Sequence, residues 1–138
     1  MLYVEDNPDD ALLLQRALRK KGFVYPLLVV EHGAKAVDYL SGTGIYSNRQ
    51  KYPLPKLIVV DLTLPIMDGF SFLRWLRTES ATKKMPAVVL SGARETTHAK
   101  LAFQNGCDAF FPKTPDTAHL EEIVQLLHDN WLEKSDSA

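Results

Sequence analysis

Five polar residues stand at the ends of apolar runs in this sequence, and their types could do chemistry together. The acidic pair Glu5 and Asp6 follows the first apolar run, and Asp61 follows the third. Ser91 follows the fourth run and Lys113 the fifth. Three carboxylates brought close together would repel each other unless a cation lies among them. Oxygen ligands without histidine or cysteine suit Mg²⁺ or Mn²⁺ rather than zinc.

Short apolar runs alternate with longer amphipathic segments, and this alternation predicts where those residues are held. We expect strands at Leu2–Val4, 27–30, 57–60, 87–90 and 109–111. We expect a first helix that begins at Pro8 after an Asn7 N-cap and ends before Gly22. Three more helices are expected at 34–40, 70–78 and 95–104. Apolar residues three or four apart mark the face of a last helix: Leu120, Ile123, Val124, Leu127 and Trp131.

Five strand-then-helix units in a row predict an α/β fold, a doubly wound parallel sheet with helices on both faces. The carboxyl ends of parallel strands meet at one edge of the sheet, and ligands bind there, where the strand order reverses. If the order is 2-1-3-4-5, the first and third strands are neighbours, and Glu5, Asp6 and Asp61 face each other. We expect Ser91 and Lys113 at the same edge.

Each of these residues taken alone has a plainer interpretation. An acidic pair after a strand is often a solvated turn, Asp61 could cap a helix, and Lys113 could be a surface cation. Ser91-Gly92 is an ordinary loop start. Their order along the chain, each directly after a strand, favours a site, because chance seldom produces that arrangement.

The composition limits the function classes. The length of 138 residues suits one domain, which we place at 1–132 with a polar tail at 133–138 and no output domain. The net charge of −1 gives no indication of a nucleic-acid or membrane partner. The single cysteine, Cys107, excludes an internal disulfide and favours a reducing, cytoplasmic location. The four histidines are dispersed and show no metal-ligand spacing.

Four segments of this sequence resemble the motifs of bacterial two-component receiver domains. They are Val4-Glu5-Asp6-Asn7, the nine residues from Asp61 to Gly69, Ser91-Gly92-Ala93, and Lys113. The resemblance covers essentially the whole chain and implies the flavodoxin-like (CheY-like) fold. The sequence also resembles a narrower group, the short stand-alone regulators of bacterial phytochromes and related histidine kinases.

The resemblance implies a phosphoacceptor that works with a divalent metal. Asp61 would be the nucleophile toward a phosphohistidine of a partner kinase. Asp6, Asp61 and the backbone carbonyl of Thr63 would bind Mg²⁺ or Mn²⁺, and Glu5 would hold a metal-bound water. Such a transfer depends on positioning and charge neutralisation. Pro65 and Asp68-Gly69 would shape the loop beside Asp61, with Asp68 as an N-cap.

The remaining site residues would bind the phosphoryl group and report its presence. Lys113 and Ser91 would each bind a phosphoryl oxygen, and Gly92 would leave the group room. Ser91 would move toward it, and Phe110 on the fifth strand would rotate inward. This movement would change the face of the fourth helix, fifth strand and fifth helix, in a homodimer or with a target. Candidate surface positions on that face are His98, Gln104 and His119.

One departure from the family pattern concerns the lysine loop. Many receivers have proline after the site lysine, whereas Thr114 follows Lys113 here, between Pro112 and Pro115. Thr63 and Ala93, which flank the phosphoryl site, lack a strong acid or base. We therefore expect only slow metal-dependent self-phosphorylation and self-dephosphorylation, in a signalling protein rather than an enzyme.

Three alternatives share parts of this pattern. A phosphorelay intermediate would use the same site and pass the phosphoryl group to a histidine phosphotransfer protein. An enzyme of the haloacid-dehalogenase type also uses an aspartate nucleophile and Mg²⁺, but that family usually places a second aspartate two residues later, where this chain has Thr63. A binding module that is not phosphorylated would not need the complete set of acidic pair, Asp61, Ser91 and Lys113.

Overall fold

The computed structural model describes residues 1–62, 68–92, 96–113 and 116–133. It contains one parallel five-stranded sheet in the order β2-β1-β3-β4-β5, as the sequence predicts. The strands are β1 (Leu2–Val4), β2 (Leu28–Val30), β3 (Ile58–Val60), β4 (Ala87–Ser91) and β5 (Ala109–Pro112). The helices are α1 (Pro8–Lys20), α2 (Gly33–Ser41), α3 (Gly69–Thr78), α4 (Thr96–Gln104) and α5 (Thr117–Leu127).

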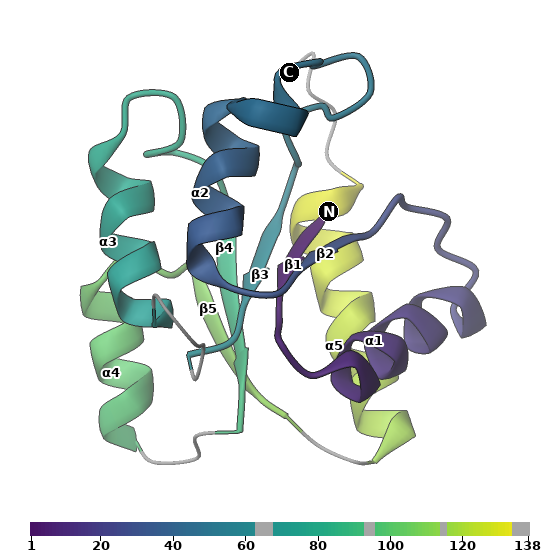
Figure 1. Cartoon of the computed structure of the whole chain (residues 1–138). Coiled ribbons are helices and arrows are strands. Elements are labelled where there is room, and N and C mark those ends of the chain that lie inside the picture. Colours follow the sequence, from purple (N-terminus) through teal and green to yellow (C-terminus); the bar gives the residue numbers. More distant parts are fainter. Residues whose placement is uncertain (63–67, 93–95, 114–115, 134–138) are drawn as a thin grey trace.

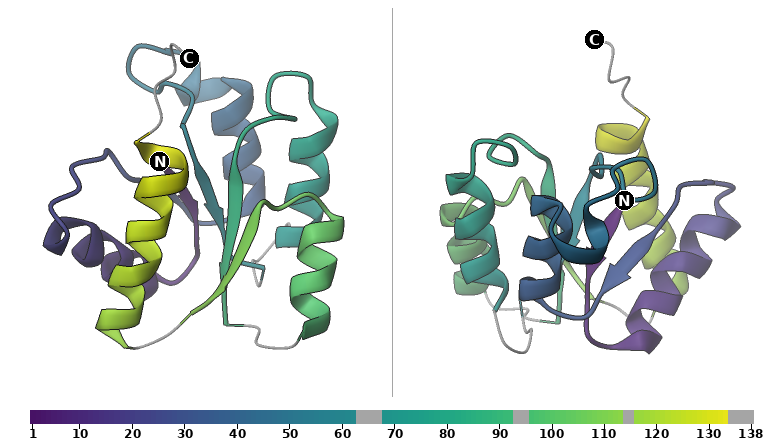
Figure 2. Two further views of the ribbon diagram at one scale, coloured as in Figure 1. Left: turned by 180° about the vertical axis from the view of Figure 1, so that it is seen from behind. Right: turned by 45° about the horizontal axis from the view of Figure 1, so that its top comes forward.

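The helices form a layer on each side of the sheet. Helices α1 and α5 cover one face, and α2, α3 and α4 cover the other (Figure 1). The view from behind shows α5 lying along the sheet, beside α1 (Figure 2). Because the central strands are covered on both sides, Ile58, Val59 and Val60 of β3 are fully buried.

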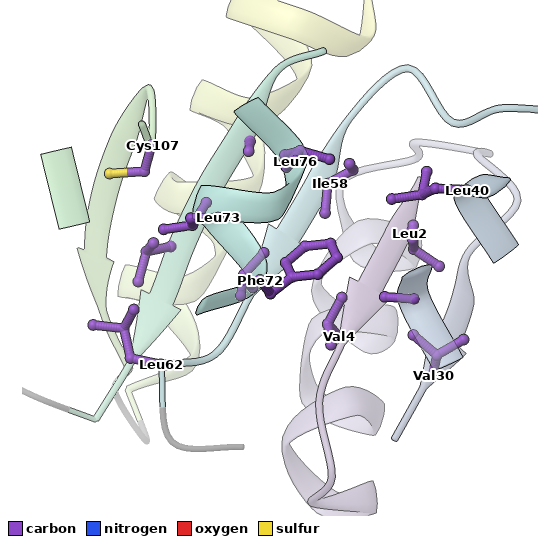
Figure 3. Close-up of a cluster of buried hydrophobic side chains, with 14 of the residues drawn as sticks. Leu2, Val4, Val30, Leu40, Ile58, Leu62, Phe72, Leu73, Leu76 and Cys107 are labelled. Carbon is purple, nitrogen blue, oxygen red and sulfur yellow. The ribbon is translucent and has the colours of Figure 1, made fainter. Parts of the chain in front are cut away.

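Two apolar cores, one on each side, fix the register of the sheet. On the α2–α3 side, Phe72 of α3 lies over β1 and β3, beside Val4 and Ile58 (Figure 3). On the other side, Leu14 of α1 and Val124 of α5 pack on the alternate residues of the same strands. A one-residue slip of a strand would exchange its two buried faces, so both cores oppose it.

The helix ends follow from the residues at them. The Asn7 side chain accepts a hydrogen bond from the backbone N–H of Asp9 at 2.9 Å, and Pro8 occupies the first helical position. The Asp68 carboxylate accepts from the N–H of Ser71 at 2.8 Å, which confirms Asp68 as the N-cap of α3. Gly22 follows α1 with φ +77°, a conformation that favours glycine.

Several element bounds differ from the predicted ones. β4 continues through Ser91, because that residue pairs with Pro112 of β5, so Ser91 is the last residue of the strand rather than the first after it. Helix α5 ends at Leu127 and continues as a π-helical turn, His128–Leu132. The long loop at 43–56 contains a 3₁₀ turn, Gly44–Tyr46. The predicted helix start at Glu95 lies outside the described residues.

Within the described part of the chain, no helix combines the length and apolar character that a membrane span needs.

Candidate functional site

The predicted site residues meet at the carboxyl ends of the strands, the lower edge of the sheet in Figure 1. Backbone hydrogen bonds continue the ladder beyond the strands and fix these residues in place. The N–H of Glu5 donates to Val30 at 2.9 Å, and that of Asp61 donates to Val4 at 3.1 Å. The N–H of Lys113 donates to the carbonyl of Ser91 at 2.7 Å. The chain therefore presents these side chains from a rigid edge.

The ammonium group of Lys113 lies among three carboxylates. Its Nζ is 2.7 Å from Glu5 Oε1, 2.8 Å from Asp10 Oδ2 and 2.9 Å from Asp61 Oδ2. Burial lowers the pKa of Lys113, but the hydrogen bonds that its ammonium donates to Asp10, Glu5 and Asp61 outweigh this effect, so the pKa is raised overall. Lys113 is therefore a permanent cation beside Asp61.

Glu5 is the most enclosed carboxylate of the site, with a side chain that is 0% exposed. Its Oε1 also accepts from the Tyr3 hydroxyl at 3.1 Å, and its Oε2 accepts from the N–H of Asn7 at 3.2 Å. Burial raises the pKa of Glu5, while the hydrogen bond from Lys113 opposes that rise. Burial, with the negative charge of Glu5, also raises the pKa of Tyr3, which keeps that hydroxyl a donor.

The acidic residues fit a divalent cation. One carboxylate oxygen from each of Glu5, Asp6 and Asp61 lies within 4.8 Å of the others. Asp6 is exposed, whereas the side chain of Asp61 is only 5% exposed, so the group opens to solvent on the Asp6 side. Such all-oxygen donors suit Mg²⁺ or Mn²⁺. The Thr63 carbonyl, predicted as a further ligand, lies outside the described residues.

Ser91 and Phe110 occupy the neighbouring strands β4 and β5 at this edge. Ser91 is completely buried. Phe110 is half-buried and packs against the core on the α2–α3 side. An added Cβ at Gly92 would meet nothing within 4 Å among the described atoms. Ala93 lies outside the described residues, as does the Lys113–Thr114 peptide.

Asp10 is a site residue that the sequence analysis missed. It lies in the first turn of α1, where an acidic residue is explained by the positive end of the helix dipole. The contact with Lys113 joins residues 103 positions apart. Asp6 precedes the N-cap Asn7 and is not part of the helix, so no helical spacing rule linked Asp10 to the acidic pair.

The candidate positions on α4 and α5 are not all at the surface. Gln104 and His119 are exposed, as predicted. His98 is only half-buried, and its Nδ1 is covered, with no hydrogen-bond partner among the described residues. His98 is therefore only partly at the surface.

Cys107 is a buried thiol, and burial raises its pKa to about 11. This agrees with a structural role.

A second acidic group at the end of α5 involves a histidine. His128, Asp129 and Glu133 bring ligand atoms within 4.8 Å of one another, which the linear spacing of the histidines did not indicate. Nδ1 of His128 is already hydrogen-bonded to the Tyr25 hydroxyl at 2.6 Å, and its ring stacks on Phe23 at 4.0 Å. These contacts explain His128 as a link between α5 and the segment before β2.

Comparison with known proteins agrees with this geometry. Residues 1–125 match the model of the response regulator receiver domain. The response regulator Rcp1 of the cyanobacterium Synechocystis is 29% identical over 133 residues, which are 96% of this chain and 88% of that protein.

Solved structures of similar proteins have the same fold. The phosphorylated cyanobacterial phytochrome response regulator RcpA has a TM-score of 0.85 at 29% identity, over 97% of this chain and 94% of that one. The Mn²⁺-bound form of Rcp1 has a TM-score of 0.82 at 28% identity, over 97% and 94%.

The similar proteins include stand-alone regulators, whose role is that of a phosphoacceptor in two-component signalling. Receiver domains take the phosphoryl group from histidine kinases and bind a divalent metal. They do not favour the relay intermediate. With its sheet order, its acidic edge and a family match over residues 1–125, this chain belongs to the response regulator receiver domain family.

Proposed function

We propose that Asp61 is the phosphoacceptor and that Mg²⁺ is the working metal, held by Asp6, Asp61 and the Thr63 carbonyl, with Glu5 on a metal-bound water. The observation that carries this proposal is the contact of Lys113 Nζ with Asp61 Oδ2 at 2.9 Å, beside the acidic group. A buried carboxylate between a fixed cation and a metal site is suited to accept a phosphoryl group, because this transfer needs charge neutralisation most.

The transfer exchanges one bond to phosphorus for another. An Asp61 carboxylate oxygen attacks the phosphorus of a phosphohistidine, the new O–P bond forms, and the P–N bond breaks with its electron pair going to the imidazole nitrogen. The bound metal supplies neutralisation of the charge on the phosphoryl oxygens. Lys113 binds one of these oxygens as a point charge, and Ser91 donates a hydrogen bond to another.

The donor we propose is a sensor histidine kinase, of the phytochrome-linked kind by analogy with the Rcp1 and RcpA regulators. Residues 1–132 form the receiver, in a cytoplasmic signalling protein. The domain also catalyses slow self-phosphorylation from small donors and slow self-dephosphorylation, with Mg²⁺.

Intact-mass measurement with Mg²⁺ and acetyl phosphate tests this function. We expect the wild-type chain to gain one phosphoryl group and the Asp61→Asn variant to gain none, because the amide is not a nucleophile toward phosphorus. Removing Mg²⁺ with a chelator should abolish the adduct as well.

The matched control is Asp38→Asn, which removes an exposed carboxylate of α2. This variant should be phosphorylated as the wild type is. The proposal fails if no donor gives an adduct on the wild type, or if Asp61→Asn still carries one.

Phosphorylation at this site can change the surface made by α4, β5 and α5. The phosphoryl group adds about two negative charges near Lys113 and Ser91, and Ser91 is directly paired with β5. Phe110, half-buried on β5, is the residue expected to move inward. Two large apolar side chains of α4 are exposed, Leu101 at 43% and Phe103 at 50%, so this helix has apolar area available for association.

Sedimentation with and without beryllofluoride, a phosphoryl mimic, tests this association. We expect the mimic to shift the protein toward a homodimer, and Phe103→Ser to reduce that shift, because it removes exposed apolar area. An unchanged mass together with unchanged partner binding would exclude this route.

A further inference from the structure

The ammonium group of Lys113 is fully occupied by its three carboxylate contacts. A lysine ammonium has three hydrogens to donate, and Glu5, Asp10 and Asp61 accept at 2.7, 2.8 and 2.9 Å. Only one of the three, Asp61, is the proposed acceptor. Glu5 and Asp10 are therefore the groups available to hold the ammonium when the oxygens of Asp61 are engaged elsewhere.

Phosphorylation changes the contact of Lys113 with Asp61, but not its contacts with Glu5 and Asp10. The Asp61 oxygen that takes up phosphorus becomes part of an acyl phosphate, and the negative charge moves outward onto the phosphoryl oxygens. Lys113 must then bind one of those oxygens while its ammonium group stays in the same place. Glu5 can contribute little adjustment, since it is 0% exposed and both its oxygens accept other protein donors.

Asp10 differs from Glu5 in that it lies at the margin of the site. Its side chain is 29% exposed, and it lies in the first turn of helix α1. The space beside the Asp10–Lys113 pair, lined also by Tyr3, Leu13 and Leu90, amounts to about 20 Å³. That is room for one water at most. The aliphatic part of the Lys113 side chain is therefore confined on its inner side, and the carboxylates of Glu5 and Asp10 direct its ammonium group.

From these contacts we infer that Asp10 is a positioning residue for phosphoryl transfer, which holds the Lys113 ammonium at the distance from which it binds a phosphoryl oxygen on Asp61. This inference rests on the proposed function. Asp10 acts through Lys113 and is not among the carboxylates that group as metal ligands, which are Glu5, Asp6 and Asp61.

The neighbouring Asp9 provides a matched control. It lies in the same first turn of α1, is exposed, and is likewise near the positive end of the helix dipole. Among the described residues, the ion pairs of Lys113 are with Glu5, Asp10 and Asp61, and Asp9 is not one of them. Asp9→Asn and Asp10→Asn therefore change the net charge and the helix end equally, but only Asp10→Asn removes an ion pair of Lys113.

The test compares phosphorylation rates from acetyl phosphate at saturating Mg²⁺. We expect Asp10→Asn to slow the reaction about 10-fold, the lower end of what outer partners of a reactive group contribute. Asp9→Asn should stay within about twofold of the wild type. Asp10→Glu keeps the charge and should recover part of the rate.

A second measurement reports on Lys113 itself, without any phosphodonor. Reductive methylation followed by peptide mass spectrometry should label Lys113 several-fold faster in Asp10→Asn than in Asp9→Asn, because an ammonium that loses a carboxylate partner is released more easily. A merely structural role of Asp10 would not produce this residue-specific change.

The outcomes separate the two proposals. If the wild type takes up no phosphoryl group on Asp61, the proposed function fails, and the role of Asp10 fails with it. If the wild type is phosphorylated normally but Asp10→Asn and Asp9→Asn match in both rate and Lys113 labelling, only the inference about Asp10 is overturned.

Discussion

Replacing Lys113 with methionine is expected to lower the free energy of unfolding by about 3 to 5 kcal/mol, measured by urea denaturation with a chelator present. The reason is the carboxylates that remain. Glu5 is 0% exposed and Asp61 is 5% exposed, and both contact Lys113 within 3 Å. A buried charge that loses its partner keeps the whole cost of its desolvation.

The size of this loss should depend on pH. Burial already raises the pKa of Glu5 to about 7 with Lys113 present, and removing the lysine raises it further. The folded variant then binds a proton that the unfolded chain, with an ordinary glutamate pKa of 4.5, releases. The variant therefore keeps this contribution to its stability below the pKa that Glu5 has in the unfolded chain. It loses the contribution as the pH rises through the pKa that Glu5 has in the folded variant. The difference from the wild type should widen as the pH rises above about 7, where Glu5 of the wild type is already ionised.

Two further variants identify the cause. Glu5→Gln combined with Lys113→Met removes the most enclosed of the charges that the single variant leaves behind, so the double variant should be more stable than Lys113→Met alone. Lys20→Met removes a lysine that is 71% exposed and 3.4 Å from Glu121, and should change stability by less than about 1 kcal/mol. A Lys113→Met variant as stable as the wild type at about pH 8 would contradict the explanation.

The fold was largely predictable because each local pattern agrees with the global one. The buried runs such as Ile58–Val60 lack alternation, which indicates strands covered on both faces, and the structure confirms it. Asn7 and Asp68 were predicted as N-caps from residue type alone, and both accept the expected hydrogen bonds. The bounds that were wrong, at Ser91 and after Leu127, depend on pairing and packing with distant segments.

The site was predictable only where its residues belong to strand ends. Topology places Glu5, Asp61 and Lys113 at one edge, so their types and order were sufficient. Asp10 and Tyr3 were missed, because each has an adequate local explanation, a helix start and a core position. Their roles come from contacts with Lys113 and Glu5, which depend on side-chain geometry that no spacing rule specifies.

Replacing Gly69 with alanine is expected to destabilise the protein by about 3 kcal/mol, and to displace Asp61. A Cβ at position 69 would lie 2.5 Å from the backbone oxygen of Asp61 and 2.6 Å from Cα of Leu62. Gly69 begins α3, where alanine would otherwise be favoured over glycine by up to about 1 kcal/mol. The clash outweighs that gain, because the atoms it meets are backbone and cannot rotate away.

Gly92→Ala is the matched control for this prediction. It makes the same substitution at the same edge of the sheet, but its added Cβ meets no atom of the described residues within 4 Å. Urea denaturation should therefore show a change within about 0.5 kcal/mol for Gly92→Ala. Acetyl phosphate with Mg²⁺ should phosphorylate Gly69→Ala much more slowly than the wild type, because the shift moves the backbone that carries Asp61. Equal stability of the Gly69→Ala and Gly92→Ala variants would show that α3 can move aside without cost, and that Asp61 does not depend on this close approach.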